Sequence, residues 1–554
     1  MVQQTKPIDV TRSYFVAYPN SIFNNLRYPF REDVPEKTPP IIAYEGHNFI
    51  PTSYGYRSYF GLNYKLDIDS LGSNCDDLFL FQLADYQNII IALCDDGLWY
   101  TASTTLTGAL WTQGISLTVP PSGEHKEWTY CIIENTLYLY REGEPHYWKM
   151  RAIDFTVVPS PLGVSLTLTP VVPTFLTMSG QKGIFRANAS LGFWDSLNSI
   201  SWSSPLDLQD FVPSLTTLAG NATFSGILGS ITTIRSQGDN FVVYTSKGIV
   251  GIRFVPSSAL IWEATTISDT AGVSSPKNVT TAITEMEHYA YTNTGFKKVG
   301  NYNALNKVHL FEEIITEVYD LFQENNPEIS MSFLNGRYLF ISLTDDKYID
   351  GIISNELDTV SDILAEAVPG AIYDYTYPGS TFLFQDGVLP DIYPTYVGAL
   401  VFDTALKKWG KFKGSYKALL DHNVFNSVDN QVLPYSHLGV DASTLNSSGD
   451  IYAFDAKPSS SFMKYGKIGY TRKGFTVMHE VRMHFRLGFT GTVILDTSLN
   501  GTTIESSLTK SYAFTNVLNA NCFPVVSGKW HTIKIAGNFD LQYLEFRGII
   551  SGRR

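Results

Sequence analysis

The sequence predicts an all-β protein in which a β-propeller is preceded by an extended N-terminal arm and followed by an antiparallel β-sandwich. A strand, a tight turn and a second, aromatic strand recur about every fifty residues, which is the length of one four-stranded propeller blade. Aromatic residues make up 14% of the chain, alongside 42 Gly and 26 Pro, a composition that favours short strands joined by turns. A single blade cannot bury its own apolar faces, so the repeats must stack beside one another.

The hairpins follow one another along residues 61–458, where we expect the propeller. The strands that mark them are 90–94, 136–140, 241–244, 288–291, 338–343, 399–402 and 451–454. Most of these strands reach a turn rich in Asp, Glu or Gly, such as Asp95-Asp96-Gly97. The large aromatic residues that we expect to be buried within or between blades are Trp202, Tyr244, Phe254, Phe402 and Trp409.

Two segments interrupt the strand pattern. Apolar residues follow a helical period over 308–322 and again over 353–367, so each segment predicts a helix. The second helix belongs to an insertion at about residues 345–395, between strands of one blade, which continues as a Tyr-, Pro-, Gly- and Asp-rich stretch without periodicity. A long irregular insertion in a compact fold is either functional or disordered.

The two ends of the chain differ from the propeller region. Residues 1–60 interleave aromatic and basic residues with nearly as many acids, which favours a strap packed on its own body or on a neighbouring subunit over an RNA-binding tail.

Residues 459–554 form a separate module. Over 475–486 the residues alternate, with Val477, Val481, Met483 and Phe485 on one face and Met478, Glu480, Arg482 and His484 on the other. Strands at 491–496, 530–535 and 541–549 complete a small antiparallel sandwich.

Charge is distributed unevenly along the chain. The formal net charge is −13, but residues 1–60 carry +1 and residues 459–554 carry +7, so residues 61–458 carry −21. Because affinity for nucleic acid comes from Lys and Arg, this negative charge disfavours tight DNA binding by the middle region.

No motif predicts catalysis or metal binding, and we expect neither an enzyme nor a cofactor. His479-Glu480 and His484 have the spacing H-E-x-x-x-H, and a strand places His479 on the opposite face from the other two. The acidic pairs Asp95-Asp96 and Asp345-Asp346 could suggest a glycosidase, which uses two carboxylates. Both pairs occupy turn positions, where an Asp side chain hydrogen-bonds its own backbone, so turn chemistry explains them without catalysis. The four cysteines lack metal-ligand spacing, so we expect buried free thiols. The start of the chain lacks a signal-peptide pattern, and we expect intracellular synthesis.

Two segments resemble parts of one protein family. Residues 200–211 read Ile-Ser-Trp-Ser-Ser-Pro-Leu-Asp-Leu-Gln-Asp-Phe, similar to the W-S-x-P-x-D…D-F strand and turn of tail proteins from short-tailed bacteriophages. Residues 537–548 and the final Arg553-Arg554 resemble the closing strand of the same proteins. These are the tail nozzle, or tail tubular, proteins and the related plug or DNA-stabilisation proteins.

The resemblance implies a function in the virion. Family members are propeller subunits of a homo-oligomeric, sixfold ring below the portal and adaptor proteins, where the ring continues the DNA channel and retains the genome until ejection. The implied partners are other copies of the chain, the portal and adaptor, tail fibres, and double-stranded DNA that passes through the lumen without tight binding. Whether the chain also contacts the host cell surface is left open. The chain would then be made in the host cytoplasm and reside in the tail. The alternative is a receptor- or glycan-binding tail propeller with depolymerase activity.

Two sets of residues are candidates for sites in such a ring. For subunit docking we expect aromatic anchors in the arm and basic residues in the C-terminal module: Tyr28, Phe30, Tyr59, Lys473, Arg482 and Arg486. The insertion carries ten acids over residues 345–391 against the single Lys347. It is either a solvated outer loop or a lumenal constriction that acts as a gate. The candidate channel residues are Asp345, Asp346, Asp350, Glu356, Asp358, Asp362, Glu366, Tyr373, Asp374, Tyr375, Tyr377, Phe382, Phe384 and Asp386.

Overall fold

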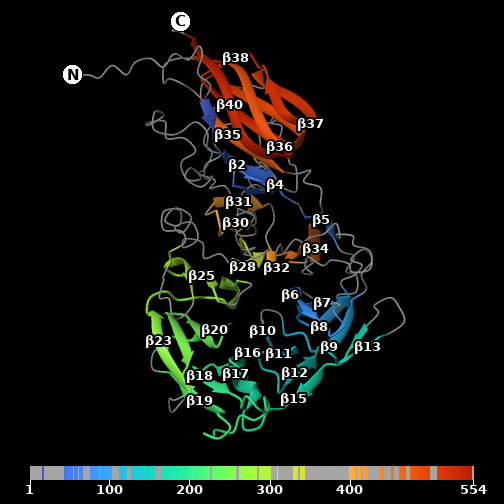
Figure 1. Ribbon diagram of the computed structural model, residues 1–554, viewed down its shortest axis with the longest axis vertical. Coiled ribbons are helices and arrows are strands. Elements are labelled where there is room, and N and C mark those ends of the chain that lie inside the picture. The colour runs from blue at the N-terminus through green and yellow to red at the C-terminus, as the bar shows by residue number, and fades with distance from the viewer. Residues whose placement is uncertain are drawn as a thin grey trace, which may run out of the picture.

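The structure is a computed structural model of the chain and consists almost entirely of β-strands. It describes residues 15–17, 43–53, 55–59, 62–65, 75–85, 88–102, 111–121, 126–157, 164–224, 227–256, 261–282, 286–300, 308–309, 329–334, 337–343, 399–406, 408–412, 416–421, 437–441, 451–454, 461–468, 475–499 and 508–551. Figure 1 shows a ring of small sheets at one end of the molecule and a large C-terminal sheet at the other. The fold predicted from the sequence, a propeller with a C-terminal antiparallel β module, is confirmed.

Five consecutive four-stranded antiparallel sheets form the first blades of the propeller. The first two blades are β6 (Cys75–Gln82), β7 (Asn88–Cys94), β8 (Gly97–Ala102) and β9 (Thr112–Ser116), then β10 (Trp128–Ile133), β11 (Thr136–Arg141), β12 (Tyr147–Arg151) and β15 (Thr169–Val171). A small hairpin, β13 (Phe155–Val157) and β14 (Val164–Leu166), lies within the second blade's sequence.

The next three blades follow the same meander. The third blade begins after the 3-10 helix η2 (Met178–Gly180), and the fifth after η3 (Pro276–Asn278). The strands are β16 (Gln181–Ala187), β17 (Ser190–Asp195), β18 (Ser199–Trp202) and β19 (Gly220–Thr223); β20 (Ile231–Gln237), β21 (Asn240–Thr245), β22 (Ile249–Phe254) and β23 (Trp262–Ser268); and β24 (Val279–Thr281), β25 (His288–Thr292), β26 (Gly295–Val299) and β27 (Val308–His309).

The circle is completed by two further meanders that differ from the first five. One comprises β28 (Ile329–Leu334), β29 (Tyr338–Leu343), β30 (Ala399–Asp403) and β31 (Lys408–Phe412), and its last strand joins the C-terminal sheet. The other, a sixth separate four-stranded sheet, comprises β32 (Tyr416–Asp421), β33 (His437–Asp441), β34 (Ile451–Phe454) and, from the N-terminal part of the chain, β5 (Leu62–Lys65). Because β32 also contacts β6, the last blade closes the propeller against the first.

The C-terminal sheet is built around one strand of 24 residues, β36 (Phe475–Ser498). One edge of β36 pairs first with β40 (Asp540–Ser551) and then with β39 (Trp530–Asn538), while the other edge pairs with β37 (Lys510–Cys522) and β38 (Val526–Gly528). N-terminal strands are woven into it: β1 (Phe15–Ala17) and β4 (Tyr56–Ser58) pair with β40, and β2 (Ala43–His47) pairs with β35 (Phe462–Ile468). β3 (Phe49–Pro51) pairs with β4 and with β31, which makes the sheet continuous from the C-terminal module into the propeller.

The strict alternation predicted for residues 475–486 is wrong at one point. The pairing of β36 with β40 shifts register between Met478 and Glu480, so an extra residue is accommodated there. This bulge places Met478 in the same buried cluster as Val481 and Met483, whereas unbroken alternation would put it on the opposite face.

Other sequence predictions can be compared with the described residues. Trp202, Tyr244 and Phe402 are buried, and Phe254 is partly buried against the fourth blade's core; Trp409 lies in β31, and its side chain is outside the described part of the structure. The helix expected over 308–322 does not begin at Val308, because Val308 and His309 form strand β27 beside β26. The remainder of that segment and the whole helix expected over 353–367 lie outside the described residues.

Candidate functional site

Charged side chains gather where the first strands of the blades meet. In a propeller the first strand of each blade lies nearest the axis, and here β6, β20, β28 and β32 hold that position (Figure 1). Five charged residues come from these strands or from η3, which leads into β24. We call them the axial cluster: Asp76, Asp77, Arg235, Lys277 and Lys417.

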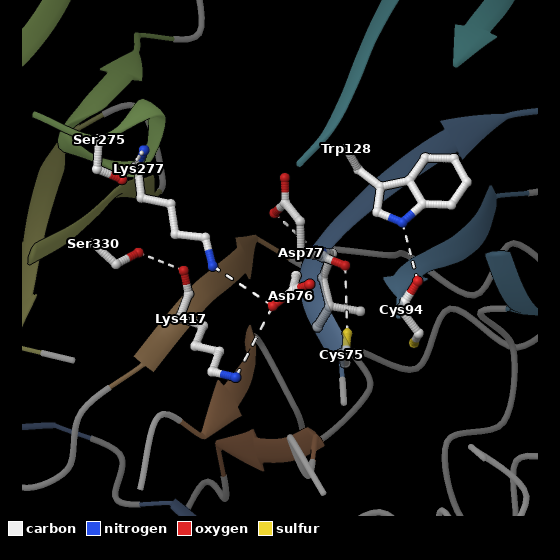
Figure 2. Close-up of polar contacts among 10 residues, drawn as sticks. Cys75, Asp76, Asp77, Cys94, Trp128, Ser275, Lys277, Ser330 and Lys417 are labelled. Carbon is white, nitrogen blue, oxygen red and sulfur yellow. Dashed lines mark hydrogen bonds and ion pairs between the residues drawn. The ribbon is translucent and has the colours of Figure 1, made fainter. Parts of the chain in front are cut away.

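Asp76 ties three parts of the propeller together. Its Oδ1 atom lies 3.8 Å from Lys277 Nζ and 4.0 Å from Lys417 Nζ, and Figure 2 shows the two lysine side chains converging on it. Both distances allow ion pairing but exceed a normal hydrogen bond. Only 9% of Asp76 is exposed, so its charge is held by the two ammonium groups rather than by bulk water.

Asp77 lies in a different electrostatic setting from its neighbour. Its Oδ1 accepts the N–H of Leu78 at 2.8 Å. Burial raises the pKa of Asp77 to about 6, against the opposing effects of Lys277, that same hydrogen bond and Arg235. Asp77 nevertheless remains partly accessible to solvent.

Arg235 and Tyr130 adjoin Asp77 from two other blades. Arg235 Nη2 donates to the carbonyl of Pro276 at 3.3 Å, while the buried Nε has no hydrogen-bond acceptor in the part of the chain that the structure describes. Tyr130, in β10, stacks on Phe79 with ring centroids 3.9 Å apart. Burial and the charge of Asp77 raise the pKa of the Tyr130 phenol, while the charge of Arg235 opposes the rise, so both charges act on this hydroxyl. The axial cluster and the adjoining Tyr130 thus bring together two carboxyl groups, three cations and a phenol.

A second polar network joins the third, fourth and fifth blades. Tyr244 Oη and His288 Nδ1 are 2.9 Å apart, and His288 Nε2 is 2.9 Å from the carbonyl oxygen of Ser236. The Ser236 hydroxyl donates to the carbonyl of Arg186 at 2.8 Å. Burial lowers the pKa of His288 to about 4, so the imidazole is neutral at pH 7. These bonds fix the blades relative to one another.

This network predicts a loss of stability in mild acid. His288 has a lower pKa when folded than its ordinary value of 6.5, so its contribution is fully present above pH 6.5 and is lost as the pH falls towards 4. Each unit by which the pKa of His288 differs between the folded and unfolded states corresponds to about 1.4 kcal/mol in the free energy of unfolding. In urea unfolding followed between pH 7.5 and 4.5, His288→Asn should flatten this part of the pH dependence. The control His146→Gln, on the turn between β11 and β12, should keep the wild-type slope; an unchanged slope in His288→Asn would contradict the assignment.

The cysteines are buried and free, as the sequence predicts. Cys75 and Cys94 are opposite one another on β6 and β7, next to the turn that Gly97 closes at φ +138°. The carbonyl of Cys94 accepts the indole N–H of Trp128 at 3.0 Å, which links the first two blades (Figure 2).

The docking residues predicted from the sequence have different outcomes. Tyr28, Phe30 and Lys473 lie outside the described residues and remain predictions. Tyr59 is only 5% exposed and its ring lies 6.5 Å from that of Tyr338, so the prediction that it anchors another subunit is wrong. Its apolar ring is used instead to bury the propeller's own core beside β29.

The two basic candidates in β36 differ from each other. Arg482 Nε lies 2.7 Å from Glu480 Oε1, so part of its charge is compensated within its own strand. Arg486 is exposed, and its docking role stays a prediction. His484 Nε2 lies 3.9 Å from Glu545 Oε2 of β40.

All the candidate channel residues lie in 344–398, outside the described residues, and their gate role remains a prediction. The structure does fix where that segment is attached. β29 ends at Leu343, β30 begins at Ala399, and Ser342 pairs with Ala399. The insertion therefore lies between adjacent strands of one blade, as the sequence analysis expects.

The axial cluster was missed by sequence reasoning. Its members are spread from residue 76 to residue 417 and form no local motif. The available signal was an ionisable residue near the start of an otherwise apolar first strand, as at Asp76-Asp77 and Lys417, and it becomes informative only once the blades are aligned.

Within the described ranges, no group of three or more metal-ligating side chains is found, and no helix is long and apolar enough to cross a membrane.

Comparisons with known proteins support no family assignment. No family model matches the sequence, and no curated protein matches it closely enough to show a relationship. Among solved structures, the extracellular domain of a one-component system from B. thetaiotaomicron matches with a TM-score of 0.39 and 11% identity, over 91% of this chain and 61% of that one. The WD40 propeller domain of Doa1 matches with a TM-score of 0.36 and 8% identity, over 72% of this chain and 97% of that domain. This chain therefore spans less than two thirds of the first structure's length.

Proposed function

We propose that the chain is a structural virion protein that assembles into an oligomeric ring and forms the distal DNA conduit of a short bacteriophage tail. The proposal begins with the resemblance of residues 200–211 and 537–548 to tail nozzle proteins. In the structure, residues 200–202 belong to β18, and the loop that follows is ordered by Asp210, whose carbonyl accepts the N–H of Ser204 at 2.8 Å. Phe211 is buried beneath this loop.

One observation carries the proposal furthest: the propeller and the C-terminal module share a continuous sheet. The pairing of Phe49 with Lys411 joins β3 to β31, and Tyr56 pairs with Leu541 of β40. Ser58 adds a backbone bond to the carbonyl of Phe539 at 2.8 Å. Two modules tied by strands resist relative rotation far better than two modules joined by one linker. A conduit wall that holds a pressurised genome needs this rigidity.

The charge distribution supports the conduit role. Residues 61–458 carry −21, and a wall of that sign repels the phosphates of passing DNA, whereas a basic wall would retain the duplex. The +7 module at 459–554 offers an opposite charge for contacts between neighbouring copies.

The purified protein, viewed by negative-stain microscopy, should form closed rings of uniform subunit number. Phage particles assembled without it should lose packaged DNA, measured as nuclease-sensitive genome. If instead the protein stays monomeric and releases sugars from host capsule, the depolymerase alternative replaces the conduit.

The oligomeric ring should weaken as salt rises, because contacts between oppositely charged faces are screened within about 3 Å at 1 M ionic strength. We expect mass photometry to show fewer rings between about 0.1 and 1 M NaCl. Arg486→Glu should lower the salt concentration at which rings dissociate. Arg253→Glu, on the outer part of the fourth blade, is the matched charge change; if both variants behave alike, or if salt has no effect, the electrostatic contact is wrong.

A further inference from the structure

We propose that the axial cluster and the adjoining Tyr130 bind one oxyanion group, a phosphate or a carboxylate, held by Arg235, Lys277 and the hydroxyl of Tyr130. This inference concerns the axis of the single propeller, not the lumen of the oligomeric ring, and it is independent of the proposed function. Three observations carry it.

The first observation is an excess of positive charge among side chains that are mostly, but not fully, buried. Arg235, Lys277 and Lys417 contribute three cations, and Asp76 compensates one of them at distances of 3.8 and 4.0 Å. Asp77 is the only other acid in the cluster. The cluster is therefore cationic in both states of Asp77, and an anion there gains more from these charges than it would at an exposed surface.

The second observation is a donor without an acceptor. Among the described residues, Arg235 Nε is buried and has no hydrogen-bond partner, while Nη2 makes a long bond of 3.3 Å to the Pro276 carbonyl. A buried donor in this state costs free energy unless it finds an acceptor. An arginine side chain presents adjacent N–H groups in a plane that matches two oxygens of a phosphate or carboxylate.

The third observation is that the donors are held by rigid elements from several blades. Lys277 lies in η3, where its own backbone N–H is capped by Ser275 Oγ at 3.3 Å. Tyr130 is fixed by its stack on Phe79, and Arg235 by β20. Because these positions are set by separate strands, they hold the donors in place before any ligand arrives.

Asp77 makes binding dependent on pH. The groups that act on it are Lys277 and Arg235, which favour its ionised form, and Asp76, which opposes it. When ionised, Asp77 repels an incoming anion; when protonated, it offers one more donor. Binding should therefore strengthen as the pH falls through about 6, with proton uptake accompanying the anion.

The test measures binding of inorganic phosphate and of acetate to the full chain by calorimetry at about pH 7.5 and 5.5, with chloride at matched ionic strength. We expect at least one of the two anions to bind with a dissociation constant of about 1 mM at the lower pH and about tenfold weaker at the higher pH. Binding of phosphate alone identifies a phosphate site, and binding of acetate identifies a carboxylate site. If neither anion binds better than chloride at either pH, the proposal is overturned.

Variants separate the site from a general charge effect. Lys277→Gln should weaken binding at least about tenfold, and Asp77→Asn should bind acetate at pH 7.5 as tightly as the wild type does at pH 5.5. Arg253→Gln removes an exposed cation that pairs with Glu263 on the outer strands, and it should change nothing. Equal losses in Lys277→Gln and Arg253→Gln would contradict the site, and so would a pH dependence of acetate binding that survives in Asp77→Asn, because phosphate itself titrates in this range.

Discussion

Removal of residues 1–65 should prevent the protein from folding. The deletion removes the outer strand of the last blade, β5, and all the N-terminal strands that enter the C-terminal sheet. It also removes Phe49, Ile50, Tyr56 and Tyr59, each at most 5% exposed. Burial of one such side chain stabilises by about 1.5–3 kcal/mol, so the four together contribute on the order of 6–12 kcal/mol. That is comparable to the whole stability of an ordinary domain, about 5–15 kcal/mol.

The measurement is circular dichroism with thermal unfolding, combined with size-exclusion chromatography. A shorter deletion of residues 1–35 is the control, because it keeps β2–β5, and it should give a folded monomer. The shorter deletion also tests Tyr28 and Phe30: it should fold but fail to assemble if they anchor a neighbouring subunit. A cooperative transition near the wild-type temperature in the 1–65 deletion would show that the N-terminal strands are dispensable.

Asp403→Ala should cost about 1–3 kcal/mol for each of the two backbone N–H groups that lose their acceptor, plus a smaller loss from the partly exposed Arg337. Asp403 is fully buried at the end of β30. Its Oδ2 atom accepts from Arg337 Nη2 at 2.7 Å and from Nε at 2.8 Å, while Oδ1 accepts the N–H groups of Ala405 and Leu406, both at 2.9 Å. The substitution removes all four acceptor contacts at once and also frees the turn that leads to β31.

Urea unfolding of matched variants separates these contributions. Asp403→Asn keeps one acceptor for the turn and should lose less than Asp403→Ala. Arg337→Ala should also lose less, because 40% of the Arg337 side chain is exposed and the turn bonds remain. Glu263→Ala breaks an exposed pair with Arg253 and should cost less than about 1 kcal/mol. If Asp403→Ala costs no more than Glu263→Ala, the buried pair does not hold this blade together.

Local features of the fold could be predicted from the sequence because local chemistry determines them. The turn at Asp95-Asp96-Gly97 and the aromatic strand after it specify a hairpin, and Cys94 does pair with Gly97. The same holds for Lys247-Gly248, between β21 and β22. The alternation of residues predicted the wrong face where the strand itself is irregular. One extra residue near Glu480 reverses the face of Met478, and no residue type there indicates the bulge.

Long-range pairing and the axial cluster could not be predicted, because the residues of a strand edge do not specify which other strand will pair with it. β5 resembles any short edge strand, yet it pairs with a strand nearly four hundred residues further along the chain, at Ala453. Likewise, Asp76 meets Lys277 and Lys417 only because the propeller closes on itself. A local pattern indicates that a strand forms and which face is buried, but not which edge lies beside it.

The pairing of β5 with β34 also sets the order in which the chain can acquire its structure during synthesis. Residue 65 leaves the ribosome 389 residues before the end of β34 at Phe454. At about 5–20 residues per second, the early strand waits roughly 20–80 seconds for its partner. During that interval the propeller of the nascent protein is not closed, and the backbone N–H and C=O groups of β5 have no partner strand. Such an exposed strand edge can pair with other chains. The final shape is therefore acquired late, and cellular factors that shield nascent edges should determine its yield more strongly than the stability of the finished molecule.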